Sequence, residues 1–168
     1  MRGLQISFDC QPRRGSCRHK HCKYTATDDA TRVRALKVYG RHTRENAIDF
    51  VNHVVEKFPF RIPTIRTDDG HEFQSLFHWR VEDLGMSHTY IRVRTPRLNG
   101  KVERSRRTDK EESYELLTYR GDVDLNAKLE EWQNCYNYHR PHSSLGGKRP
   151  YESLREKLNL NVAQAKVE

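Results

Sequence analysis

The sequence predicts a single α/β domain, in which helices flank a mixed sheet made of a three-stranded meander and two further strands. Its 168 residues suffice for one sizeable core and are too few for two ordinary domains. Strand-like runs follow one another early in the chain, whereas later strand-like runs alternate with helical periodicity. This order is typical of a mixed sheet with helices on both faces.

The predicted meander occupies the N-terminal part of the chain. Apolar and polar residues alternate over 4–9, as in a half-buried strand, and Asp9 ends this run. Two further β-prone runs lie within 24–39, on either side of the turn signal formed by Asp28 and Asp29. Three antiparallel strands are therefore expected before the first helix.

Helices and short strands alternate in the rest of the chain. Thr43 is suited to cap an amphipathic helix over 44–57. The last long helix is expected to place five residues on one buried stripe: Leu125, Leu129, Trp132, Cys135 and Tyr136. The remaining expected elements are a strand over 62–65, a turn at 68–70, a helix over 72–84, a strand over 88–93, helices over 100–117 and 124–139, and a short helix ending near 158.

The charge balance favours an anionic partner. The net charge is +8 and the pI is about 9.5, and such a surplus of cations attracts phosphate through counterion release. Residues 91–110 hold eight basic residues against only two acids, Glu103 and Asp109. No apolar run reaches the roughly 18–20 residues of a membrane helix, and the N-terminus lacks a secretory apolar region. A cytoplasmic protein with no membrane partner is expected.

The four cysteines do not show a complete zinc spacing. Cys17 and Cys22 form one C-x4-C pair near His19 and His21, but no second C-x2-4-C or H-x3-5-H pair accompanies it. Free thiols in a reducing compartment are the simpler expectation.

Two carboxylates stand out because different elements deliver them into a basic setting. Asp68 follows a predicted strand, and Glu103 lies near the start of a predicted helix. Two Mg²⁺ ions held by carboxylates can activate a nucleophile and stabilise a leaving oxygen in phosphodiester chemistry. Asp9 is the natural third carboxylate. Simpler readings remain open, in which Asp68 only forms a turn and Glu103 only complements a helix dipole.

Four passages occur in a characteristic order: Y-T-A-T-D-D-A-T-R, I-R-T-D-D-G-H-E-F, T-P-R-L-N-G-K-V-E-R-S and Y-H-R-P-H-S-S-L-G-G-K-R-P-Y-E. They resemble the integrase core of bacterial insertion-sequence transposases of the DDE class. The resemblance covers about 19–158 and implies a ribonuclease-H-like fold with the catalytic triad of retroviral integrases. One catalytic core over 1–158 is expected, with residues 1–18 poorly matched, followed by a C-terminal tail over 159–168.

The resemblance implies cleavage of DNA strands and their transfer during transposition, with two divalent ions, Mg²⁺ or Mn²⁺. It assigns catalytic and metal-binding roles to Asp68 and Glu103, with Asp9 as the remaining ligand. The chain departs from the usual pattern in three places. F-D-C-Q replaces a D-V-K-F-like strand, Asp69 replaces Asn, and Arg106 stands where His is frequent.

DNA contacts are expected around Glu103. The expected contact residues are Asn99, Lys101, Arg104, Arg106 and Arg107. On a helix, Glu103 and Arg107 share a face, so a cation would flank the scissile phosphate; the alternative is a solvated charged face. The resemblance implies transposon ends and target DNA as partners, and a homo-oligomer on DNA.

Two other functions remain open. The absence of the helix-turn-helix region of such transposases, together with the poor match around Asp9, motivates an inactive remnant that only binds DNA. A nuclease of the same fold that does not transpose is the third hypothesis.

Overall fold

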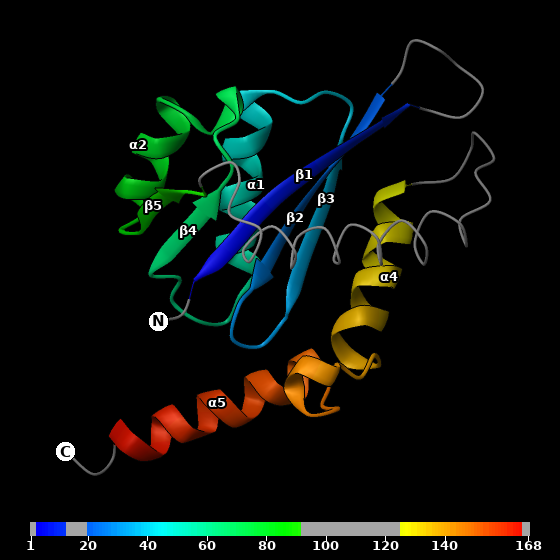
Figure 1. Cartoon of the computed structure of the whole chain (residues 1–168), viewed down its shortest axis with the longest axis vertical. Helices are drawn as coiled ribbons and strands as arrows, with labels where there is room; N and C mark the ends of the chain where they lie inside the picture. The colour runs from blue at the N-terminus through cyan, green and yellow to red at the C-terminus, as the bar shows by residue number, and fades with distance from the viewer. Residues whose placement is uncertain (1–2, 13–19, 92–124, 166–168) are drawn as a thin grey trace.

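A five-stranded mixed sheet organises the molecule. The computed structural model describes residues 3–12, 20–91 and 125–165, with the backbone alone at 8–12, 20–21, 125 and 160–165. The strands are β1 (Leu4–Pro12), β2 (Lys20–Asp28), β3 (Arg34–Tyr39), β4 (Thr64–Thr67) and β5 (Ser87–Tyr90). Their order is β3-β2-β1-β4-β5, with β1 to β3 antiparallel and β4 and β5 joined in parallel (Figure 1). The predicted sheet, a meander plus two strands, is confirmed.

The helical elements begin and end largely where local signals place them. They are α1 (Arg44–Lys57), η1 (His71–Phe73), α2 (Leu76–Asp83), α4 (Leu125–Tyr138), η3 (Ser143–Leu145) and α5 (Pro150–Ala165). Thr43 caps α1 as predicted, because its Oγ1 accepts a hydrogen bond from the amide of Asn46 at 3.3 Å. The cap and the bounds of α1 both match the sequence pattern.

The main core lies between one face of the sheet and α1. Leu4 and Ile6 of β1 alternate with more polar neighbours, and both are about 1% exposed. Tyr24 of β2 and Phe50 of α1 meet on this face with ring centroids 5.5 Å apart. Burying an apolar side chain of this size contributes roughly 1.5–3 kcal/mol, so this face supplies much of the stability and holds β1 and β2 rigidly.

The other edge of the meander is covered by α4 (Figure 1). Asn137 accepts a hydrogen bond from the Arg34 amide at 2.9 Å and donates one to the Arg34 carbonyl at 2.8 Å. Gln133 accepts from the Leu36 amide at 2.7 Å, and Asn126 accepts from the amide two residues further along β3 at 3.2 Å. Amide side chains thus replace a neighbouring strand at an edge that would otherwise expose its backbone groups.

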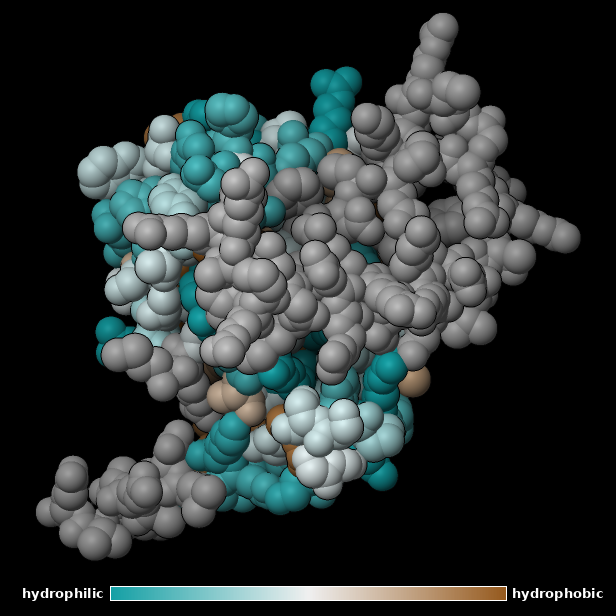
Figure 2. Space-filling model, viewed as in Figure 1, coloured by the Kyte–Doolittle hydropathy of each residue, from teal (hydrophilic) through white to brown (hydrophobic). Residues whose placement is uncertain are grey.

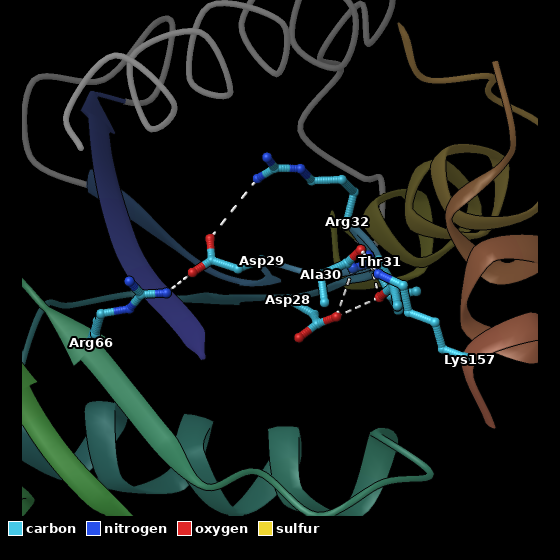
Figure 3. A network of polar contacts seen from close by, with 8 residues as sticks. Asp28, Asp29, Ala30, Thr31, Arg32, Arg66 and Lys157 are labelled. Atoms are coloured by element: carbon cyan, nitrogen blue, oxygen red, sulfur yellow. Dashed lines mark hydrogen bonds and ion pairs between the residues drawn. The ribbon is translucent and has the colours of Figure 1, made fainter. Parts of the chain in front are cut away.

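The turn between β2 and β3 is held by a polar network (Figure 3). Asp28 accepts hydrogen bonds from the amide and the hydroxyl of Thr31 at 2.8 and 2.6 Å. Asp29 forms an ion pair with Arg66 of β4, and Lys157 of α5 donates to the Ala30 carbonyl. The turn predicted at Asp28 and Asp29 is therefore present, and its carboxylates serve the fold.

Several predicted boundaries are wrong. The strand expected over 62–65 is β4, shifted towards Thr67, and the strand expected over 88–93 is described as β5. The helix expected over 72–84 is interrupted, because Ser75 has a φ of 50° between η1 and α2. The last helix does not end near 158 but reaches Ala165. The helix expected over 100–117 lies outside the described residues.

The described cysteines differ in their state. The expectation of free thiols is wrong for Cys22, which is disulfide-bonded, whereas Cys135 is free and exposed.

Among the described residues, no helix is long and apolar enough to cross a membrane. The described surface visible in Figure 2 is predominantly hydrophilic.

Candidate active site

Asp68 is the first residue after the buried end of β4. The hydroxyl of Thr67 donates to the Asp68 carbonyl at 2.9 Å, which fixes the backbone at the point where the strand ends. Asp69 is exposed, and its carboxylate accepts a hydrogen bond from the Gln74 side chain at 3.2 Å. The two neighbouring acids are thus in different settings: Asp69 serves the local loop, while Asp68 lies beside the sheet.

Asp9 lies on β1, the strand next to β4, but further along it. Leu4 pairs with Ile65 and Gln5 with Arg66 in parallel register, and continuing this register sets Ser7 level with Asp68. Asp9 is two residues beyond Ser7, about 6–7 Å further along the same face of the strand. The structure therefore places the backbones of Asp9 and Asp68 on adjacent strands with an offset.

A buried cation shares the sheet position of Asp9. Lys23 of β2 is the cross-strand partner of Asp9 and is only 3% exposed. The backbone partner of Asp9 on β2 is therefore a buried basic residue and not a second carboxylate.

A three-residue polar chain anchors the loop after Asp68. Tyr24 and Nδ1 of His42 are 2.6 Å apart, and Nε2 of His42 lies 2.8 Å from Oε1 of Glu72. The second contact is close but not well aligned as a hydrogen bond. Burial, followed by the charge of Glu72, raises the pKa of the Tyr24 phenol far above its usual range. This chain joins β2, the start of α1 and η1.

The remaining predicted site residues come from a part of the chain that the structure does not describe. Glu103 and the expected DNA contacts lie within 92–124, outside the described residues: Asn99, Lys101, Arg104, Arg106 and Arg107. Within the described part of the chain, no group of three or more His, Cys, Asp or Glu side chains is arranged to hold a metal ion. Of the predicted triad, only Asp68 is described with its side chain.

Sequence reasoning did not single out Tyr24, His42, Glu72 or His88. Their polar groups meet only after folding, from elements far apart in the chain. His88 was expected only as part of a strand, yet its Nε2 lies 2.9 Å from the Thr67 hydroxyl. Glu72 stands in a polar passage, D-D-G-H-E-F-Q-S, so nothing in the local sequence marks its side chain as largely buried.

The fold belongs to a class seen in solved structures. With a TM-score of 0.71, the chain is similar to the HTLV-2 integrase catalytic core domain in complex with magnesium, at 17% identity over 89% of this chain and 92% of that one. It is also similar to the catalytic core domain of BIV integrase, with a TM-score of 0.68 and 19% identity over 98% of this chain and 97% of that one. These likenesses establish the ribonuclease-H-like fold of integrase catalytic cores.

Larger relatives extend the comparison. The chain from the intasome of simian T-cell lymphotropic virus, solved with the PP2A regulatory subunit B56 gamma, gives a TM-score of 0.76. The identity is 18%, over 88% of this chain and 52% of that one. The "Putative integrase ORF3" of Spiroplasma virus SpV1-C74 is 30% identical over 85% of this chain and 44% of its own length. The chain thus spans about half the length, or less, of these two relatives.

Sequence similarity points to the same family as the fold. Residues 84–150 match the integrase core domain family. Together with the viral relative and the integrase folds, this match confirms the resemblance to integrase cores.

Proposed function

We propose that this chain is the catalytic core of a DNA transposase that cleaves DNA strands and transfers them with the help of Mg²⁺ or Mn²⁺. One observation carries the proposal: in an integrase-type sheet, Asp68 directly follows β4, beside the strand that carries Asp9. The donor set fits a hard cation, since Asp68, Asp9 and Glu103 offer only carboxylate oxygens. Two bound ions would polarise the scissile phosphate and its leaving oxygen.

The chain's own residues have positioning and DNA-binding roles in this proposal. The Thr67 hydroxyl holds the backbone of Asp68, and the Tyr24–His42–Glu72 chain holds the following loop. The basic residues around Glu103 contact phosphates: Lys101, Arg104, Arg106 and Arg107, with Asn99 beside them. The partners are transposon ends and target DNA, and the protein works as a homo-oligomer on DNA in the cytoplasm.

The test is strand nicking and joining on transposon-end DNA with Mg²⁺ or Mn²⁺. Asp68→Asn and Glu103→Gln remove carboxylate charge from the proposed site and are expected to abolish both reactions. Asp69→Asn is the matched control, because this neighbouring acid is exposed and bonded to Gln74; it should retain activity. Activity that survives Glu103→Gln would contradict the role given to Glu103. Nicks without joined strands would indicate a nuclease of the same fold.

A second function, a remnant that binds DNA without cutting it, is favoured by the residues around Asp9. Lys23 is buried opposite Asp9, and Ser7, which has no carboxylate, is the residue level with Asp68 in the continued register. Salt-dependent DNA binding without metal-dependent cleavage, unaltered by Asp9→Asn, would support the remnant over the enzyme.

A further inference from the structure

Two histidines face each other between α2 and β5. The Nδ1 atoms of His78 and His88 are 3.1 Å apart, and their ring centroids are 5.3 Å apart. The His78 side chain is 33% exposed, whereas His88 packs against the rings of Phe77 and Tyr90 at 5.1 and 4.6 Å. The pair is therefore open to solvent on one side and backed by aromatic rings on the other.

The hydrogen-bond partners of His88 determine which of its nitrogens carries a proton. The Thr67 hydroxyl has one hydrogen, and it donates that hydrogen to the Asp68 carbonyl at 2.9 Å. With that donation, Thr67 Oγ1, which lies 2.9 Å from Nε2 of His88, accepts from an Nε2–H group. Burial, followed by the neighbouring His78, lowers the pKa of His88 to about 4. At neutral pH the His88 ring is thus uncharged, with a lone pair on Nδ1.

The contact with Glu82 favours a proton on the outer nitrogen of His78, Nε2, in the same way. Nε2 of His78 lies 3.3 Å from Oε1 of Glu82, one helical turn further along α2. An ionised carboxylate only accepts hydrogen bonds, so it favours an Nε2–H group on His78. A neutral His78 with this proton also has its lone pair on Nδ1.

These assignments leave two nitrogen lone pairs facing each other at 3.1 Å. Two lone pairs at this separation repel each other, and a cation relieves the repulsion. A proton does so when one Nδ1 donates it to the other. A metal ion does so with both rings neutral when it lies off the line that joins the two nitrogens, because the midpoint of that line is too close to both for a Zn–N bond.

We propose that His78 and His88 form a binding site for a transition-metal cation of the zinc type, with water as the further ligands. Tetrahedral zinc with Zn–N bonds of about 2.0–2.1 Å separates two nitrogen ligands by roughly 3.3 Å, close to the 3.1 Å observed. Glu82 and Thr67 hold the outer nitrogens, the arrangement that orients metal-bound histidines. Nitrogen donors favour zinc over Mg²⁺, which prefers oxygen.

This histidine site is independent of the proposed DNA chemistry, because none of the three carboxylates proposed for that chemistry (Asp9, Asp68 and Glu103) is a ligand of the histidine site. It has two protein ligands, because no group of three metal-binding side chains occurs among the described residues. Its occupancy can therefore be measured without any DNA reaction.

The experiment is a Zn²⁺ titration of the ¹⁵N-labelled full chain at neutral pH, with excess Mg²⁺ present, followed by imidazole ¹⁵N resonances. We expect the Nδ1 resonances of His78 and His88 to shift together and to saturate at one Zn²⁺ per site. His78→Gln should remove the shift at His88. Glu82→Gln should weaken Zn²⁺ binding by about tenfold or more, as loss of an orienting partner does.

The control is His71→Gln, since His71 is an exposed histidine on η1 and not a member of this pair; it should leave the titration unchanged. Far-UV circular dichroism checks that each variant is folded. The site is overturned if Zn²⁺ leaves both Nδ1 resonances unmoved, or if His88 still shifts in the folded His78→Gln variant.

Discussion

At the residue scale, the position of the carboxylate on β1 determines whether it can bind a metal ion together with Asp68. The continued β1–β4 register sets Ser7, not Asp9, level with Asp68. Ser7→Asp would place a carboxylate level with Asp68, so we expect Mn²⁺ to bind about tenfold more tightly, a change of about 1.4 kcal/mol. Titration calorimetry measures this, and Ser7→Asn is the control of similar size without charge.

The same titration decides the role of Asp9. If Asp9→Asn removes Mn²⁺ binding while Ser7→Asp adds none, Asp9 is the ligand despite its offset and the buried Lys23. If Asp9→Asn changes nothing and Ser7→Asp creates binding, the chain has lost the first carboxylate of its site.

Glu72 offers a second test at this scale, through stability. Its side chain is 10% exposed and that of His42 is 20% exposed. Glu72→Ala leaves the buried His42 nitrogen without its carboxylate, and a buried group that loses its partner costs about 1–3 kcal/mol. Urea unfolding should show a loss of this size, whereas Glu56→Ala, at an exposed position of α1, should change stability little. Equal losses in the two variants would contradict the anchoring role of Glu72.

At the element scale, the elements whose bounds are predicted correctly are those with start and stop signals inside their own stretch of sequence. α1 has its cap at Thr43 and its apolar period within one stretch, so its bounds match the prediction. β4 depends on pairing with β1 and β5, and Ile62 is buried without being part of the strand. The pairing partners are distant in sequence, so the boundary could not be predicted from the passage itself. The break at Ser75, with its positive φ, likewise has no Gly or Pro to signal it.

The buried face of α4 shows a similar limit. Leu129 and Tyr136 lie on it as predicted, but Cys135 is exposed. The face instead includes Gln133 and Asn137, whose amides bond the edge of β3. Apolar periodicity locates the helix, but it does not reveal that polar side chains replace a strand.

Substitution of Asn137 tests this arrangement. Asn137→Leu removes the side-chain amide that bonds both the amide and the carbonyl of Arg34, so we expect a loss of about 2–4 kcal/mol in the free energy of unfolding. The freed edge of β3 should also promote association between chains, visible in size-exclusion chromatography. Asn134→Leu introduces the same side chain at an exposed position of α4. If both variants lose stability equally, the edge bonds are not the cause.

At the scale of the whole molecule, the described fold and the basic segment have different roles in the proposed function: the fold supplies the stable core, and the segment supplies the cations for DNA binding. The sheet and α1 supply the core, and the described carboxylates of Asp28 and Asp29 serve a turn rather than chemistry. The cations that would contact DNA are concentrated in residues 91–110, which hold eight of the chain's 31 basic residues. Affinity for DNA should therefore depend on this segment more than on the overall charge of +8.

Salt dependence of DNA binding tests this division. Each phosphate contact that is lost should reduce the slope of log K against log salt by about 0.9 on duplex DNA. Arg106→Ala and Arg107→Ala should each reduce the slope by about that amount. Arg155→Ala, at an exposed position of α5, removes the same charge outside the segment and should leave the slope nearly unchanged. Equal effects of all three variants would mean that net charge, rather than a defined DNA-contacting segment, governs binding.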